Sequence, residues 1–231
     1  MPAQATSSIF ATGAYTLPDA AHLLNLPLAR LRWWVRGALL TSEDATQTRR
    51  FPVGPLESSG EGRDRHFGFL TLIELFTIAQ LRSHGVRMST LRAARTELSV
   101  RYETPFPFAL RGLLTDGSSL IKELGEEALL EIGTGGQTAF ESLLRPFCHS
   151  LDFDTATQLA NRFFPAGRKS FIIVDPKHSF GRAVIVGTNI TTESIASLIR
   201  GGEQVEDVAI DFRLEPEQVQ EAYSFEQRLA A

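Results

Sequence analysis

The segment LARLRWWVRG, residues 28–37, gathers the side chains best suited to hold a charged ligand. It contains both tryptophans of the chain and three basic residues, Arg30, Arg32 and Arg36. Guanidinium groups match phosphates and the guanine edge in geometry and charge. These residue types at this spacing therefore predict a helix that contacts nucleic acid.

Helical geometry decides where each of these side chains points. At about 100° per residue, one face of a helix over residues 28–37 is apolar and holds Leu28, Leu31 and Val35. Trp34 flanks that face and is predicted to lie in the core, whereas Trp33 lies among the arginines on the opposite side. The alternative is that Trp33 packs under a following loop.

More basic residues follow in a polar stretch, residues 41–66, which has no apolar periodicity. They are Arg49, Arg50, Arg63, Arg65 and His66. A loop of this length in a compact domain is usually functional or disordered. We predict a flexible basic loop.

Enzymatic chemistry finds little support in the sequence. GTGG, residues 133–136, lacks the Gly-Lys-Ser/Thr of a phosphate loop and is interpreted as a turn. Cys148 beside His149 could suggest a nucleophile, but no acid is positioned with them, so a packed cysteine is favoured. Asp152 and Asp154 are interpreted as a surface turn. We expect no catalytic residue, no metal site and no cofactor.

Composition and charge bound the class of protein. Among 231 residues a single cysteine excludes a disulfide framework and a thiolate metal cluster. The absence of a basic-then-apolar leader and of a long apolar run predicts a cytoplasmic protein with no membrane segment. Residues 1–101 hold 12 Lys+Arg against 8 Asp+Glu, and residues 102–231 hold 11 against 19. This asymmetry arises either by drift between two domains or because only the first half binds nucleic acid.

Helices must position the arginines. Thr16 is a plausible N-cap, followed by Pro18 and Asp19 in the first turn of a helix that Asn25-Leu26-Pro27 ends. With the helix over residues 28–37, this pair predicts a helix-turn-helix. An amphipathic helix that ends at Gly85 follows, and then a helix capped near Ser89 or Thr90. The prolines after Tyr102 should end that helix.

The remainder of the chain predicts strands and further helices. Alternation at Phe106, Phe108 and Leu110 predicts a β-rich stretch over residues 106–136, and residues 137–165 suggest helical pieces. FIIV and AVIV predict strands. Three short helices should follow: the first is capped by Thr191 or Thr192 and ends at Gly201-Gly202, and the third starts at Pro216. The third helix is predicted to turn carboxylates outward, namely Glu215, Glu217 and Glu221, which would repel phosphate.

The order of elements over residues 14–100 resembles the DNA-binding domain of MerR-type regulators. YTLPDAAHLL matches the first helix, LARLRWWVRGALL matches the recognition helix, and RHFGFLTLIELFTIAQLRSHGVRMSTLRAAR matches the return strand of the wing and two helices. The resemblance implies a phosphate contact for Arg32, a backbone contact for Trp33 and a core position for Trp34. Trp33 replaces the usual tyrosine, and the long dimerisation helix of that family is missing.

Residues 171–227 resemble the small domain of unknown function (the 433 family) that is found in VapB-type antitoxins and beside PIN-like ribonuclease toxins. The resemblance rests on the strand before Asp175-Pro176, the strand before Gly187-Thr188, and GGEQVEDVAIDFRLEPEQVQEAYSF. Together with a MerR-like domain it implies an antitoxin that binds operator DNA as an autorepressor and neutralises a PIN-like toxin. The alternative is a MerR-like regulator that responds to a small ligand and has no toxin partner.

The sequence thus predicts an α+β protein: a winged helix-turn-helix, a β-rich middle segment and a C-terminal three-helix bundle. The expected divisions are a flexible arm (1–14), the DNA-binding domain (15–101), a β-rich connecting or dimerisation region (102–170) and a trihelical antitoxin-type domain (171–231). The expected partners are double-stranded DNA, a PIN-like toxin and a second copy of the chain. The predicted DNA-binding residues are Thr16, Arg30, Arg32, Trp33, Arg36, Arg49, Arg50, Arg63, Arg65 and His66.

Overall fold

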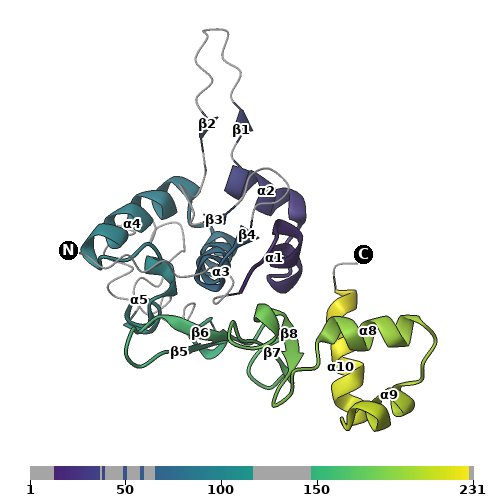
Figure 1. Ribbon diagram of the computed structural model, residues 1–231. Helices are drawn as coiled ribbons and strands as arrows, with labels where there is room; N and C mark the ends of the chain where they lie inside the picture. The colour runs from purple at the N-terminus through teal and green to yellow at the C-terminus, as the bar shows by residue number, and fades with distance from the viewer. Residues whose placement is uncertain are drawn as a thin grey trace.

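The computed structural model describes residues 13–36, 38–39, 49–50, 58–59, 66–116 and 147–228. Helices occupy the two ends of this part of the chain, and a four-stranded antiparallel sheet lies between them in sequence (Figure 1). The fold is therefore α+β, as the sequence predicts. The main apolar core draws on helices from both ends and on one face of the sheet, and a small second cluster is formed by Phe164, Ile173 and Val184.

The chain begins with two short helices, α1 (Leu17–Leu23) and α2 (Leu28–Arg36). Thr16 caps α1 as predicted, because its hydroxyl accepts from the N–H of Asp19 while the Asp19 carboxylate accepts from the N–H of Thr16 at 2.8 Å. Asn25, at φ 52°, turns the chain before Pro27. The two helices and their turn therefore have the predicted boundaries.

In the residues that the structure describes between α2 and Phe67, the chain forms four strands of two residues each. β1 (Ala38–Leu39) pairs antiparallel with β2 (Arg49–Arg50), and β3 (Ser58–Ser59) pairs with β4 (His66–Phe67). β4 lies where the MerR resemblance implies a return strand. Tyr15 and Phe67 exchange two backbone hydrogen bonds of 2.9 Å, which tie this strand to the start of α1.

Two longer helices form the centre of the N-terminal half. α3 (Phe69–Ser83) ends before Gly85, which takes φ 96° as a terminating glycine does. α4 (Met88–Arg101) ends before Tyr102, as predicted. The expected cap at Ser89 or Thr90 is wrong: the turn at Gly85 leaves Arg87 extended, so Arg87 is the N-cap and the helix begins at Met88.

The strand predicted from the alternation at Phe106, Phe108 and Leu110 is also wrong within the described residues. The chain forms a 3₁₀ turn, η3 (Pro107–Ala109), and then α5 (Arg111–Asp116). Pro105 and Pro107 have no N–H to donate to a ladder and have a fixed φ. Residues 117–136 of the predicted β-rich stretch, including GTGG, lie outside the described residues.

The sheet has the order β5-β6-β7-β8 and is antiparallel throughout. β7 (Ile172–Val174) and β8 (Ala183–Ile185) are the predicted strands, with η4 (Ser179–Gly181) between them. Over residues 147–165, β5 (Leu151–Phe153) and β6 (Ala160–Phe163) correct the expectation of helical pieces, and a helical turn forms at residues 147–149. Residues 137–146 of the expected helical pieces lie outside the described residues. The sheet joins strands from both sides of the expected boundary at residue 170.

Three helices close the chain: α8 (Thr192–Arg200), α9 (Val205–Phe212) and α10 (Pro216–Gln227). Thr191 caps α8, and Pro216 opens α10, as predicted. The helices pack through buried apolar side chains of Ile195, Ala196, Val208, Ala209, Val219, Ala222 and Phe225. Glu215 and Glu217 are exposed as predicted, but Glu221 is not turned outward: its carboxylate accepts from the Ser170 hydroxyl and from the Phe171 N–H.

Candidate nucleic-acid interface

The exposed face of α2 is basic and aromatic. Arg30 and Arg32 are exposed, and Trp33 keeps 48% of its surface exposed. Trp34 is buried with 3% exposed, and Leu31 and Val35 complete the buried face. The predicted division between the two tryptophans is therefore confirmed, and Trp33 is not covered as the alternative required. Arg36 closes the helix, but its side chain lies outside the described residues.

The predicted wing residues are only partly described. β2 places the backbone of Arg49 and Arg50 opposite β1, which follows α2 almost directly, with Ala38 opposite Arg50 and Leu39 opposite Arg49. Both strands lie on the side of the molecule away from the four-stranded sheet (Figure 1). Arg63 and Arg65 lie outside the described residues.

Two further predicted residues have structural roles. The hydroxyl of Thr16 caps α1 by accepting from the N–H of Asp19, and it also donates to the Asp19 carboxylate at 2.6 Å. His66 lies in β4, opposite Ser59, and is half-buried. Both residues lie close to the α1–α2 pair in the fold, since β4 is bonded to the residue before Thr16.

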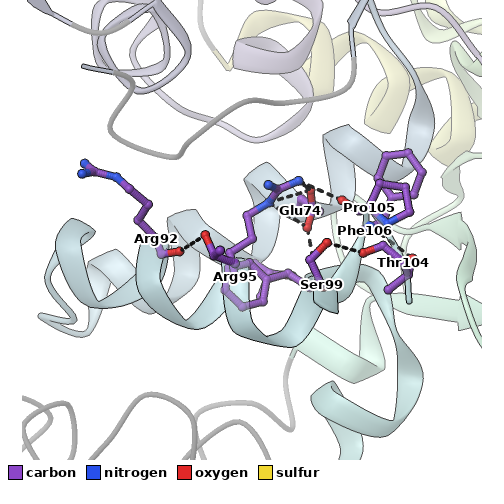
Figure 2. A network of polar contacts seen from close by, with 10 residues as sticks. Glu74, Arg92, Arg95, Ser99, Thr104, Pro105 and Phe106 are labelled. Atoms are coloured by element: carbon purple, nitrogen blue, oxygen red, sulfur yellow. Dashed lines mark hydrogen bonds and ion pairs between the residues drawn. The ribbon is translucent and has the colours of Figure 1, made fainter. Parts of the chain in front are cut away.

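A buried ion pair supports this part of the molecule. The Arg95 guanidinium on α4 donates to the Glu74 carboxylate on α3, with Nε 3.1 and 3.2 Å from the two oxygens and Nη2 2.7 Å from Oε2 (Figure 2). The Glu74 side chain is fully buried. Nη2 of Arg95 also donates to the carbonyl of Pro105 at 2.8 Å. A buried carboxylate with this geometry fixes α3, α4 and the following turn relative to one another.

The turn after α4 is held by further polar contacts. The N–H of Phe108 approaches the Glu74 carboxylate at 3.4 Å, and the carbonyl of Phe108 accepts from the Thr77 hydroxyl at 3.0 Å. Ser99 donates to the carbonyl of Thr104 at 2.6 Å (Figure 2). This network was not predicted from the sequence. Its signal was a single acidic residue inside the apolar run FLTLIELFTI, which demands a charged partner when buried.

A second unforeseen feature is the junction between α1 and the C-terminal helices. The phenol of Tyr15 donates to the carbonyl of Gly181 at 2.8 Å, 166 residues away in the chain. Burial and the charges of Asp175 and Asp19 raise the pKa of Tyr15 well above its ordinary value, so the phenol stays protonated. His22 of α1 lies edge-on to the Phe225 ring of α10, with centroids 5.1 Å apart.

The polar residues that could suggest an enzyme are Cys148, Asp152 and Asp154, and each is partly buried, hydrogen-bonded or paired within the fold. Burial raises the pKa of the Cys148 thiol to about 11, which leaves it protonated and a poor nucleophile at neutral pH. Hydrogen bonds from the N–H and hydroxyl of Thr157 lower the pKa of Asp154, which closes a turn. Asp152 pairs with Arg168 at 2.7 Å. In the described residues, no group of three or more His, Cys, Asp or Glu side chains could hold a metal ion.

One protein family matches the C-terminal segment of the chain, and two curated proteins are similar to nearly its full length. Residues 172–225 match the family described as "Protein of unknown function (DUF433)", which confirms the resemblance of the last segment. The chain is 22% identical to a Mycobacterium tuberculosis protein named "Putative antitoxin VapB45", over 90% of this chain and 91% of that one. It is 26% identical to "Uncharacterized protein Rv2308" of the same organism, over 94% and 92% of the two chains.

A solved structure shares the fold. The crystal structure of Rv2018 from Mycobacterium tuberculosis superposes with a TM-score of 0.65 and 19% identity, covering 90% of this chain and 95% of that chain. None of the described helices is long and apolar enough to cross a membrane.

Proposed function

We propose that this protein is an antitoxin that binds operator DNA through α2, represses its own transcription and neutralises a PIN-like ribonuclease toxin. Similarity along nine-tenths of the chain to a protein named as an antitoxin supports the class of function. The observation that carries the DNA-binding part is the exposed face of α2, where Arg30, Arg32 and Trp33 are displayed without an acidic residue in the helix.

In this proposal α1 and α2 form a MerR-like helix-turn-helix. Arg30 and Arg32 contact phosphates and set the register, and Trp33 packs against the sugar-phosphate backbone. The arginines of residues 49–65 add backbone or minor-groove contacts. A homodimer reads two half-sites about one helical turn apart.

DNA binding is tested by the affinity of the full chain for its own upstream DNA and for a scrambled duplex across a salt series. Sequence-selective binding that weakens steeply with salt supports the proposal, because each neutralised phosphate adds about 0.9 to the slope of log K against log salt. Equal, weak binding to both duplexes at low salt would remove operator recognition from the proposed function.

The toxin-binding part rests on α9. Ile210 is 75% exposed there, with Glu206, Asp207 and Asp211 exposed within one helical turn of it. Interfaces place apolar side chains at their centre and polar ones at their rim, and Ile210 with its acidic neighbours has that layout. We assign this face to the PIN-like partner.

The test uses a PIN-like ribonuclease toxin and the full chain, because the sheet crosses residue 170 and a truncation there would cut it. Ile210→Ser should weaken the complex by about 10-fold or more in calorimetry. Val100→Ser is the matched control, because Val100 on α4 is 76% exposed. Operator binding by a chain that captures no toxin would instead favour the alternative, a DNA-binding regulator.

A further inference from the structure

The exposed face of α2 has an apolar centre between two charged flanks. Ala29 and Trp33 are both exposed and lie one above the other, one helical turn apart. At about 100° per residue, the exposed Arg30 lies to one side of this line and the exposed Arg32 to the other. The face therefore presents two apolar side chains in a row, with one guanidinium group on each side of them.

Apart from its arginines, α2 has no side chain of the types that read bases by hydrogen bonds. Its sequence LARLRWWVR contains no Asn, Gln, Ser, Thr, Lys or acidic residue. The Thr16 hydroxyl, at the start of α1, is engaged in the cap of that helix and donates to the Asp19 carboxylate. If Arg30 and Arg32 contact phosphates, as in the proposed function, α2 must recognise its sequence through apolar contacts. The apolar group that a base pair displays in the major groove is the thymine C5-methyl group.

The sizes of the exposed side chains decide which part of α2 approaches the bases. The major groove is about 12 Å wide, and a helix with its side chains is about 10–12 Å across. Ala29, in the first turn of α2, has the smallest side chain of the exposed face, whereas Trp33, one turn later, has the largest. The first turn can therefore come closest to the base edges, and Trp33 meets the sugar-phosphate backbone. Figure 1 shows α2 on the side of the molecule from which β1 and β2 project, away from the four-stranded sheet.

We propose that Ala29 determines the specificity of operator binding by packing against thymine C5-methyl groups, while Arg30 and Arg32 hold the phosphates on the two sides of the groove. This inference rests on the proposed operator binding and names the base group that α2 recognises. The contact between alanine and a thymine methyl group is apolar, so it neutralises no phosphate and releases no counterion. Loss of the methyl group should therefore lower the affinity and leave its salt dependence unchanged.

Deoxyuridine tests the proposal, because it differs from thymidine only in lacking the C5-methyl group. The full chain is titrated with its own upstream DNA and with the same duplex in which uracil replaces every thymine. Burial of one methyl group is worth about 4-fold in affinity, so a dimer with one such contact in each half-site should lose about 15-fold. The slope of log K against log salt should stay the same. A scrambled duplex should bind equally well with thymine and with uracil.

A third duplex, with 7-deazaguanine in place of guanine, tests the competing base contact, because it lacks the N7 acceptor that an arginine uses on guanine. With Arg30 and Arg32 on phosphates, this duplex should bind like the natural one. Loss of affinity with 7-deazaguanine but not with uracil would overturn the proposal and make an arginine the reader. Equal affinity for all three duplexes, with selectivity over the scrambled duplex retained, would overturn it and leave operator binding intact. Equal binding of the natural and scrambled duplexes would contradict operator recognition itself, and this inference with it.

A variant assigns the methyl contact to Ala29. Ala29→Gly should bring the ratio of the affinities for the natural and the uracil duplex close to unity, because the thymine methyl groups lose their apolar partner. The ratio is taken within one variant, so a smaller fraction of folded protein does not change it. Ala93→Gly is the matched control, since Ala93 is an exposed alanine on α4, and this variant should keep the full ratio. An undiminished ratio with Ala29→Gly, or an equal decrease with Ala93→Gly, would overturn the role assigned to Ala29.

Discussion

The first two helices and the last three are built alike but display opposite charges. In both regions short helices with buried apolar faces are joined by tight turns. α2 exposes Arg30 and Arg32, whereas α9 and α10 expose carboxylates, namely Glu206, Asp207, Asp211, Glu215 and Glu217. A helix-turn-helix layout is therefore not enough to indicate DNA binding, because the charge on the exposed face decides whether a phosphate backbone is attracted.

The two halves of the molecule that contain these helices also differ in how they are held together. The N-terminal half buries the Glu74–Arg95 ion pair between α3 and α4. The C-terminal helices pack through aliphatic side chains and Phe225, with Glu221 and Glu226 hydrogen-bonded at the border to the sheet and α8. We therefore expect the stability of the N-terminal half to be sensitive to the loss of a buried charge, and that of the C-terminal helices to the loss of side-chain volume.

The largest expected loss of stability comes from a substitution in the Glu74–Arg95 ion pair. Glu74→Met should lower the free energy of unfolding by about 3–5 kcal/mol, because it leaves the Arg95 guanidinium buried without a carboxylate. The Glu74→Met/Arg95→Met double variant should recover most of this loss, since two flexible apolar side chains can fill the space. Urea unfolding measures both. If the double variant is no more stable than the single one, the pair is not the element that distinguishes the two regions.

The next largest loss of stability is expected from a substitution at the junction between Tyr15 and Gly181. Gly181 and Gly187 both take φ 79°, but a Cβ on Gly181 would lie 2.2 Å from the Tyr15 hydroxyl, whereas nothing lies within 4 Å of one on Gly187. Gly187→Ala should cost about 1–2 kcal/mol from its backbone alone. Gly181→Ala should cost about 2 kcal/mol more, because Tyr15 must move. Equal losses in thermal unfolding would mean that Tyr15 does not hold the two regions together.

The sequence predicted the helices better than the contacts between them. Thr16, Gly85, Thr191 and Pro216 are local signals of where helices begin and end. Three of them act where expected, whereas α3 ends at Ser83, two residues before the predicted Gly85. The basic face of α2 followed from its periodicity alone. These features depend on neighbours within one or two turns, which a single sequence displays.

The predictions were wrong where residues far apart in the chain determine the local structure. β5 and β6 are three and four residues long and include the charged residues Asp152 and Arg162. Strands this short do not show an alternation of apolar and polar residues that could be recognised in the sequence. The strand expected at Phe106 and Phe108 is replaced by η3, whose Phe108 bonds to α3 through Glu74 and Thr77. The hydrogen bond between Tyr15 and Gly181 joins residues 166 positions apart, so no local sequence pattern predicts it.

A smaller effect is expected at acid pH in the C-terminal region. Burial alone would raise the pKa of Asp175, but hydrogen bonds from the Lys177 N–H and the Arg162 guanidinium, with His178 nearby, hold that pKa below its ordinary value. Asp175 therefore stabilises the fold above pH about 4, the unfolded-state pKa, and this contribution is lost as pH falls through the lower folded-state pKa.

Asp175→Asn should accordingly cost about 1–3 kcal/mol at pH 7, and the difference from the natural chain should shrink as pH falls below about 4. Urea unfolding between pH 3 and 7 measures it. Asp211→Asn is the control, because it removes the same charge from an exposed position on α9. A difference that stays constant with pH would show that the carboxylate charge of Asp175 is not what stabilises this region.

The smallest change in free energy, and the most direct test of the opposite charges, is in DNA binding. Arg32→Gln on α2 should lower the slope of log K against log salt by about 0.9, the contribution of one phosphate contact, whatever the sequence of the duplex. Arg213→Gln removes the same charge from the acidic C-terminal region and should leave the slope unchanged, although it alters the net charge of the chain equally. If the two variants lose the same slope, DNA responds to net charge and neither helical region is the reader. If only Arg213→Gln lowers it, the roles assigned to the two regions are reversed, and the carboxylates of α9 and α10 must then lie on the side away from the duplex.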